Sequence, residues 1–142
     1  DLLMVIKHYA NHDAYGDVII LNEDNQKVVP YKTLRFDVYK LNMKEKNVEY
    51  VDCLDNCVIL LELNQSFVLC ANEYPGLKRN SVYFLDDFPE KIYDFNCEYG
   101  GHELGIYDLE ENSITPFLPL GKPNKIYQQM FWIEPLSSFA SL

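Results

Sequence analysis

A pair of similar strand patterns constrains the fold of this chain more than any other feature. Residues 36–41 and 48–51 form strand-sized runs around a short charged turn, and residues 104–109 and 114–117 do the same around an acidic turn. Each pattern predicts a β-hairpin. An apolar strand comes before each hairpin, at 2–7 and at 82–85, and a loop of uneven length separates the two. Such a repeat is typical of kelch-like β-propeller blades, although a plain antiparallel sandwich also accommodates it.

The segments between the two patterns also indicate strands. Residues 56–63 and 66–71 predict a hairpin that turns at Asn64-Gln65, and residues 81–85 predict a strand after the Pro75-Gly76 turn. Residues 17–21 and 26–30 predict a small hairpin within a variable loop. Helix is expected only as single 3₁₀ turns at 74–78 and 87–91. We therefore predict an all-β fold of consecutive antiparallel meanders in at least two small sheets.

The length of the chain limits how much of a propeller it can build. With 142 residues it is long enough for one domain with a single core. A closed propeller needs at least about four blades of roughly 40 to 50 residues each. The chain is therefore expected to form two to three blades, as an incomplete propeller. The absence of an initiator methionine before Asp1 also suggests a piece of a longer protein.

The charge balance excludes some classes of partner. The chain has 22 acidic and 12 basic residues and a net charge of −10. Because both are negatively charged, nucleic acids and anionic lipids are not expected as partners. The apolar runs, such as residues 2–6 and 57–61, are too short for a signal-peptide core or a membrane span. We expect a soluble intracellular protein.

The residues with catalytic or metal-binding chemistry are scattered. Four cysteines, at positions 53, 57, 70 and 97, form no CxxC pair, and buried free thiols are favoured over disulfides. His8 and His12 lie near Asp13, but no cysteine pair or further histidine at a supporting spacing completes a zinc site. No nucleophile elbow, phosphate loop or HExxH motif occurs. The sequence predicts no catalytic residue, no metal and no cofactor.

The insert at 88–101 is the best candidate for binding another protein. Aromatic side chains on a loop that a rigid sheet carries are typical interface anchors, and nearby carboxylates favour a basic partner. Folding of the insert back over the blade remains an equal alternative. The candidate partner-binding residues are Phe88, Glu90, Tyr93, Asp94, Phe95 and Tyr99.

Several segments together resemble a known family. They are DLLMVIKHY at 1–9, the strand-rich stretch at 36–69, SFVLCANEYPGLKRNSVYFLDD at 66–87, LGIYDLEENSITPF at 104–117 and MFWIEP at 130–135. In this order they are similar to the C-terminal part of the plant KIB-type β-propeller family, formerly a domain of unknown function in plant F-box proteins. The resemblance implies propeller blades over 1–136, with a variable loop at 11–32 and the insert at 88–101, followed by a frayed tail at 137–142.

The resemblance also implies a function. The family's propellers are expected to recognise protein substrates for SCF-type E3 ubiquitin ligases, with a Skp1-type adaptor bound by an F-box upstream of this chain. The compartment would then be the cytoplasm or the nucleus. An alternative is an F-box-less scaffold propeller, in some cases organellar, without a ligase role. A propeller enzyme is the third alternative, and it would need a metal or carboxylate cluster at the central channel.

Overall fold

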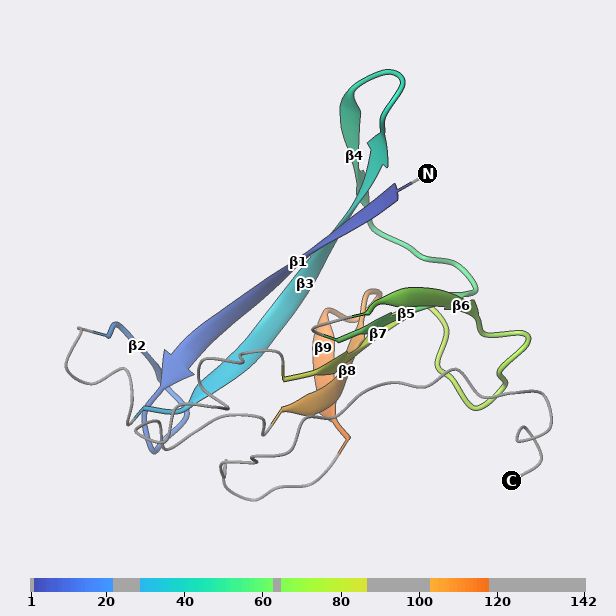
Figure 1. Cartoon of the computed structure of the whole chain (residues 1–142). Coiled ribbons are helices and arrows are strands. Elements are labelled where there is room, and N and C mark those ends of the chain that lie inside the picture. Colours follow the sequence, from blue (N-terminus) through green and yellow to red (C-terminus); the bar gives the residue numbers. More distant parts are fainter. Residues whose placement is uncertain (1, 22–28, 63–64, 87–102, 118–142) are drawn as a thin grey trace.

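The computed structural model describes residues 2–21, 29–62, 65–86 and 103–117, and within these ranges the chain forms nine strands and no helix. The first sheet has the order β2-β1-β3-β4, and the second has the order β6-β5-β7-β8-β9 (Figure 1). The strands are β1 (Leu2–His12), β2 (Val18–Ile19), β3 (Tyr31–Asn42), β4 (Asn47–Val51), β5 (Cys57–Leu61), β6 (Phe67–Cys70), β7 (Ser81–Leu85), β8 (Leu104–Asp108) and β9 (Ser113–Pro116). The predicted all-β fold is confirmed. In the described ranges there is no helix of the length and hydropathy that a membrane crossing requires.

The predicted repeat is present as two copies of one unit. β3 lies between β1 and β4 and pairs antiparallel with both. In the same way, β8 lies between β7 and β9 and pairs antiparallel with both. The β3–β4 and β8–β9 turns also match in detail. In one, the Asn42 side chain accepts backbone N–H bonds from residues 44 and 45, and in the other Asp108 accepts them from residues 110 and 111. Both turns end on a residue with positive φ, Lys46 at 54° and Asn112 at 51°.

The matching turns correct the alignment of the two copies. The sequence pattern pairs residue 40 with Asp108, whereas the turn geometry pairs Asn42 with Asp108, a shift of two residues. Side chains on a strand alternate with a period of two, so a shift of two leaves every residue on the expected face of the sheet. For this reason the repeat was recognisable in the sequence despite the shift.

The pairing of β5 with β7 departs from a simple meander. These two strands are parallel, with Val58 opposite Ser81 and Ile59 opposite Val82. The connection from β6 to β7 therefore passes the start of β5, where Asn80 donates its backbone N–H to Cys57 O at 2.9 Å. All five residues of β7 are buried, which suits a central strand with a neighbour on each side.

Two of the predicted local features differ or lie outside the described residues. Residues 74–78 form a hydrogen-bonded turn, in which Leu77 N donates to Tyr74 O at 2.9 Å, and no 3₁₀ helix. Within the first arm of the hairpin expected at 17–21 and 26–30, β2 pairs with the end of β1. Residues 22–28 and 87–91 are not described, so the remaining parts of these predictions stay untested.

An apolar core joins the two sheets. The Phe36 ring of β3 lies with its centroid 5.0 Å from that of Phe84 and 5.7 Å from that of Tyr107. Val38 and Val82 are fully buried beside them. A second cluster, with Val58, Leu60, Leu69 and Tyr83, lies on the other face of the second sheet. The second sheet thus has apolar residues packed on both faces, as a propeller blade does.

The outward face of the first sheet is apolar but exposed. Met4 lies opposite Tyr39, which in turn lies opposite Tyr50, and the two tyrosine rings are 5.5 Å apart. The exposed large apolar residues of this face are Leu2, Met4, Ile6, Val48 and Tyr50. Large exposed apolar patches are uncommon on a folded monomer, and they are typical of surfaces that another part of a protein covers.

Gly105 provides a test of how the Phe84 ring packs over the neighbouring strand of the second sheet. A Cβ at this position would lie 2.9 Å from Phe84 Cζ and 3.2 Å from Thr115 O, whereas a Cβ at Gly76 would have no atom within 4 Å. Because overpacking a core costs about 1–3 kcal/mol, Gly105→Ala should lower the free energy of unfolding by about that amount. Gly76→Ala is the matched control and should change it by less than about 0.5 kcal/mol. Urea unfolding measures both, and equal effects of the two substitutions would contradict this packing.

Candidate interaction surface

The six predicted partner-binding residues, Phe88, Glu90, Tyr93, Asp94, Phe95 and Tyr99, all lie outside the described residues. The residues that flank their insert are described. Asp86 follows β7 directly, and Glu103 directly precedes β8. The structure therefore shows which contacts hold the two ends of the insert.

The two ends of the insert are bonded to each other. Asp86 donates its backbone N–H to Glu103 O at 2.7 Å. The backbone N–H of Glu103 in turn lies 3.4 Å from Asp86 Oδ2, to which it donates. The backbone bond continues the β7–β8 ladder by one step, and the Asp86 side chain adds the second bond. The insert therefore starts and ends at neighbouring points on the sheet.

The first sheet holds the same two residues through β3. The Tyr31 hydroxyl donates to Asp86 Oδ2 at 2.6 Å. Thr33 donates twice to the Glu103 carboxylate, from its backbone N–H at 2.6 Å and from Oγ1 at 2.7 Å. We call Tyr31, Thr33, Asp86 and Glu103 the loop-base cluster. Because β3 begins at Tyr31, the cluster lies at the end of the β2–β3 connection and at both ends of the β7–β8 connection.

The loop-base cluster places a carboxyl group in an unfavourable environment for charge. Partial removal from water raises the pKa of Glu103 above its usual range, and the hydrogen bonds from Thr33 oppose this rise. The Lys7 charge also lowers this pKa, while the nearby Asp86 raises it. The net direction is upward, so the folded protein favours the protonated form of Glu103 more than the unfolded chain does.

A β-bulge next to the cluster decides which side chains face the core. The β1–β3 register shifts between His8 and Tyr9, which pair with Arg35 and Thr33, so Leu34 is the extra residue. Before the bulge the buried positions of β3 are 31 and 33, and after it they are 36 and 38. Without the extra residue, a strand with period two could not point both the cluster and the Phe36 core inward.

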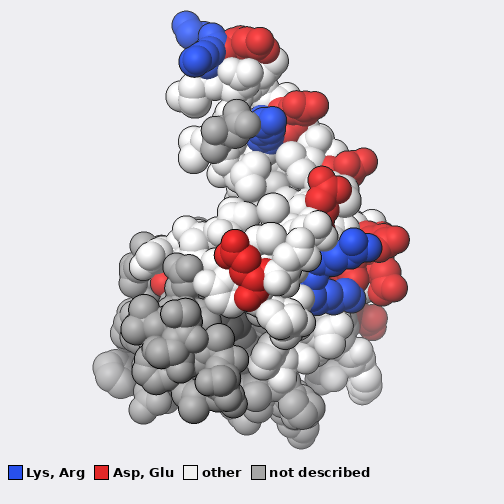
Figure 2. Space-filling model, turned by 90° about the vertical axis from the view of Figure 1, so that its right-hand side faces the viewer, with Lys and Arg blue, Asp and Glu red and all other residues white. Residues whose placement is uncertain are grey.

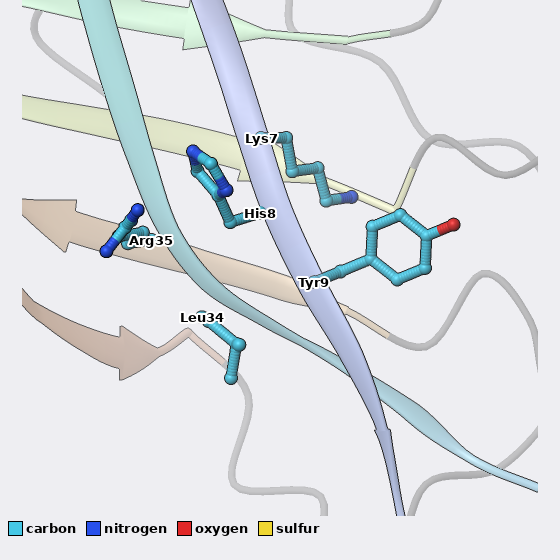
Figure 3. A pocket seen from close by; sticks show the side chains of 5 residues that line it. All are labelled: Lys7, His8, Tyr9, Leu34 and Arg35. Carbon is cyan, nitrogen blue, oxygen red and sulfur yellow. The ribbon is translucent and has the colours of Figure 1, made fainter. Parts of the chain in front are cut away.

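The bulge also shapes a shallow depression of about 510 Å³ lined by Lys7, His8, Tyr9, Leu34 and Arg35 (Figure 3). His8 and Arg35 lie next to each other on one side of β1, and Lys7 and Tyr9 lie on the other side (Figure 3). The His8 ring nitrogen Nε2 is 2.6 Å from Asp37 Oδ2. The described residues that line this depression supply two cationic groups, an imidazole and a phenol, which suit polar contacts.

His8 and His12 have different hydrogen-bond partners. His12 Nδ1 lies 2.9 Å from the backbone oxygen of Asp13, while His8 contacts Asp37. Within residues 2–21, 29–62, 65–86 and 103–117, no three His, Cys, Asp or Glu side chains are placed to hold a metal ion. The described part of the face in Figure 2 shows lysine and arginine beside acidic residues, without a separate basic patch.

The sequence predicted the insert but not the β3 residues that hold its two ends. It placed Tyr31 and Lys32 in a variable loop and began the strand at residue 36, because the bulge breaks the alternation between 33 and 36. The alternation of Tyr31 with Thr33, read separately from that of Phe36 with Val38, was the available signal. The pairing of Thr33 with Glu103 joins residues 70 positions apart, and no local pattern reveals such a contact.

The raised pKa of Glu103 predicts how stability depends on pH. A carboxyl group with a raised folded pKa makes the protein more stable below its unfolded pKa of about 4.3. That stability is lost as the pH rises through the folded pKa. Glu103→Gln keeps hydrogen-bonding atoms for Thr33 and removes the charge, so it should match or exceed the wild-type stability at pH 7.5. Its advantage should shrink towards pH 4.

Thermal unfolding of both proteins across this pH range measures the difference. The exposed Glu49→Gln is the matched control and should show no such trend. An advantage of Glu103→Gln that grows as the pH falls would contradict the assigned direction of the pKa.

Comparison with known proteins gives the family. Residues 1–108 match the family described as KIB1-4 beta-propeller. A protein of Arabidopsis thaliana named as F-box protein At4g17565 is 25% identical over 133 residues, which cover 92% of this chain and 32% of that protein. Another, named as F-box protein At5g66830, is 30% identical over 83 residues, 58% of this chain and 20% of its own length.

A third relative from the same plant, named as F-box/kelch-repeat protein At5g24040, is 25% identical over 83 residues, 58% of this chain and 21% of its own length. The chain thus spans about a third or less of the curated relatives it matches. No solved structure matches the chain. The match over 1–108, together with the two stacked sheets and their repeated hairpins, shows that the chain belongs to the KIB1-4 beta-propeller family.

Proposed function

We propose that this chain is part of a propeller that recognises protein substrates for an SCF-type E3 ubiquitin ligase of plants. The observation that carries the proposal is membership of a β-propeller family whose relatives are named as F-box proteins. In such a ligase the propeller binds the substrate, and the other subunits catalyse the transfer of ubiquitin. The compartment that follows from it is the cytoplasm or the nucleus.

The frame around the insert supports a binding role. The ends of 87–102 are joined by the Asp86–Glu103 bonds and tied to β3 by Tyr31 and Thr33. A loop whose ends are held on a rigid sheet loses less conformational freedom on binding than a loop with mobile ends. The candidate residues on this loop are aromatic and acidic, and we propose a protein partner with a basic, partly apolar surface.

The exposed apolar face of the first sheet supports the incomplete propeller. One face of this sheet packs on the second sheet, and the opposite face carries Leu2, Met4 and Tyr50 in exposed positions. Blades of a propeller stack face to face around a central axis. We propose that a further blade of the longer protein covers this face, and that residues 1–136 are C-terminal blades.

The partner-binding proposal is tested by substitution in the full-length protein. Loss of a buried aromatic anchor typically costs about 2 kcal/mol or more, so Tyr93→Ala or Tyr99→Ala should weaken partner binding about 30-fold. Glu90→Ala should mainly slow association. Glu45→Ala is a control in the β3–β4 turn, at the end of β3 far from the loop-base cluster. It should change neither the affinity nor the association rate. Isothermal calorimetry gives the affinity and surface plasmon resonance the rates.

The melting temperature of each variant shows whether a loss of affinity is caused by a lost contact with the partner or by a less stable fold. If Tyr93→Ala and Tyr99→Ala lower the melting temperature and the affinity together, the insert covers the blade and is no partner site.

The ligase role needs an adaptor as well as a substrate. The full-length protein should co-purify with a Skp1-type adaptor and a cullin, and deletion of the upstream F-box should abolish this association. The reconstituted complex should then ubiquitylate the bound partner. A full-length protein that binds its partner but no adaptor would favour the F-box-less scaffold.

A further inference from the structure

Two cysteines face each other directly across the β5–β6 hairpin. In the antiparallel register Cys57 is the partner of Cys70, followed by Val58 with Leu69 and Ile59 with Val68. All three cysteines in the described residues, at 53, 57 and 70, are free thiols. The register adds information that the presence of two cysteines alone does not give. A shift of one residue would place their side chains on opposite faces of the sheet.

The hydrogen bonds around the pair identify its type. The preceding pair, Asn56 and Ala71, is hydrogen-bonded, since Ala71 N donates to Asn56 O at 2.8 Å. Bonded and non-bonded pairs alternate along an antiparallel ladder, so Cys57 and Cys70 form a non-hydrogen-bonded pair. Consistent with this, Cys57 O accepts from Asn80 N, and Cys70 O accepts from Glu73 N. In such a pair the Cα atoms approach to roughly 4.5 Å, within the range that a disulfide spans.

Both side chains lie on the same face and remain within reach of solvent. Opposed residues on adjacent strands point to the same side of a sheet. On that side Cys57 packs against the core between the sheets, together with Leu61. Cys57 and Cys70 are each half-buried, so a small oxidant can reach them.

We propose that Cys57 and Cys70 form a reversible cross-strand disulfide, made by exchange with a small-molecule disulfide such as oxidised glutathione. The thiolate of one cysteine attacks the small disulfide, forms a mixed disulfide and releases one small thiol. The second cysteine then attacks the protein sulfur of this mixed disulfide and releases the other small thiol. The chain loses two protons and two electrons, and the small disulfide is reduced to two thiols.

The bond would covalently link β6 to β5. β6 is the outer strand of the described second sheet and is held by β5 alone, whereas β5 also pairs with β7. Oxidation would therefore fix the edge hairpin to the body of the sheet without changing its register, because the two cysteines are already opposed.

The test oxidises the intact wild-type chain. The reduced, folded protein is equilibrated with mixtures of reduced and oxidised glutathione, alkylated, and cleaved after acidic residues. Glu62 lies between the two cysteines and Asp55 separates Cys53 from Cys57, so cleavage yields a Cys57 peptide linked to a Cys70 peptide only if the disulfide exists. We expect both alkylation sites to be lost together in most molecules, and dithiothreitol to restore both.

The controls use the third described cysteine. Cys53→Ser removes an exposed thiol and should leave the linked peptides unchanged. Cys57→Ser and Cys70→Ser should each abolish them. The proposal is overturned if the wild-type Cys57 and Cys70 remain open to alkylation under oxidising conditions. Recovery of these residues linked only to glutathione, to Cys53 or to another chain would overturn it as well.

Discussion

The packing of Phe36 against Phe84 and Tyr107 is the interaction on which the rest of the structure depends. These three rings join one strand of the first sheet to two strands of the second, and neither sheet has a core of comparable size without the other. Apolar burial is strong but has no direction, so it brings two sheets together without deciding their exact alignment. Alignment requires interactions with fixed geometry.

The loop-base cluster supplies that geometry. Its hydrogen bonds join Tyr31 and Thr33 of β3 to Asp86 and Glu103 beside β7 and β8, at the edge of the apolar contact. Polar groups that are removed from water stabilise a structure only when their partners are placed correctly, so they discriminate against other alignments of the sheets. The raised pKa of Glu103 indicates that this specificity costs some stability at neutral pH.

The two ends of the molecule differ in the connections that they carry. At one end, the β2–β3 connection ends at the loop-base cluster and the β7–β8 connection begins and ends there, beside the bulge and its depression. At the other end, the β3–β4 and β8–β9 turns are short and closed by Asn42 and Asp108. Length variation in a propeller domain is tolerated where loops leave the sheets, and binding residues gather there for the same reason. Cys57 and Cys70 lie away from these connections, at the hairpin that borders the second sheet.

The sequence by itself determined most of the strands, the β3–β4, β5–β6 and β8–β9 hairpins, and the family. Short apolar runs separated by turn residues carry that information locally, and a two-residue error in aligning the repeats did no harm because strand faces alternate with a period of two. Only the tertiary structure decided the parallel pairing of β5 with β7, the bulge at Leu34 and the contact of Thr33 with Glu103. Each depends on the burial of residues that are far apart in the chain. A local sequence pattern does not identify such distant partners.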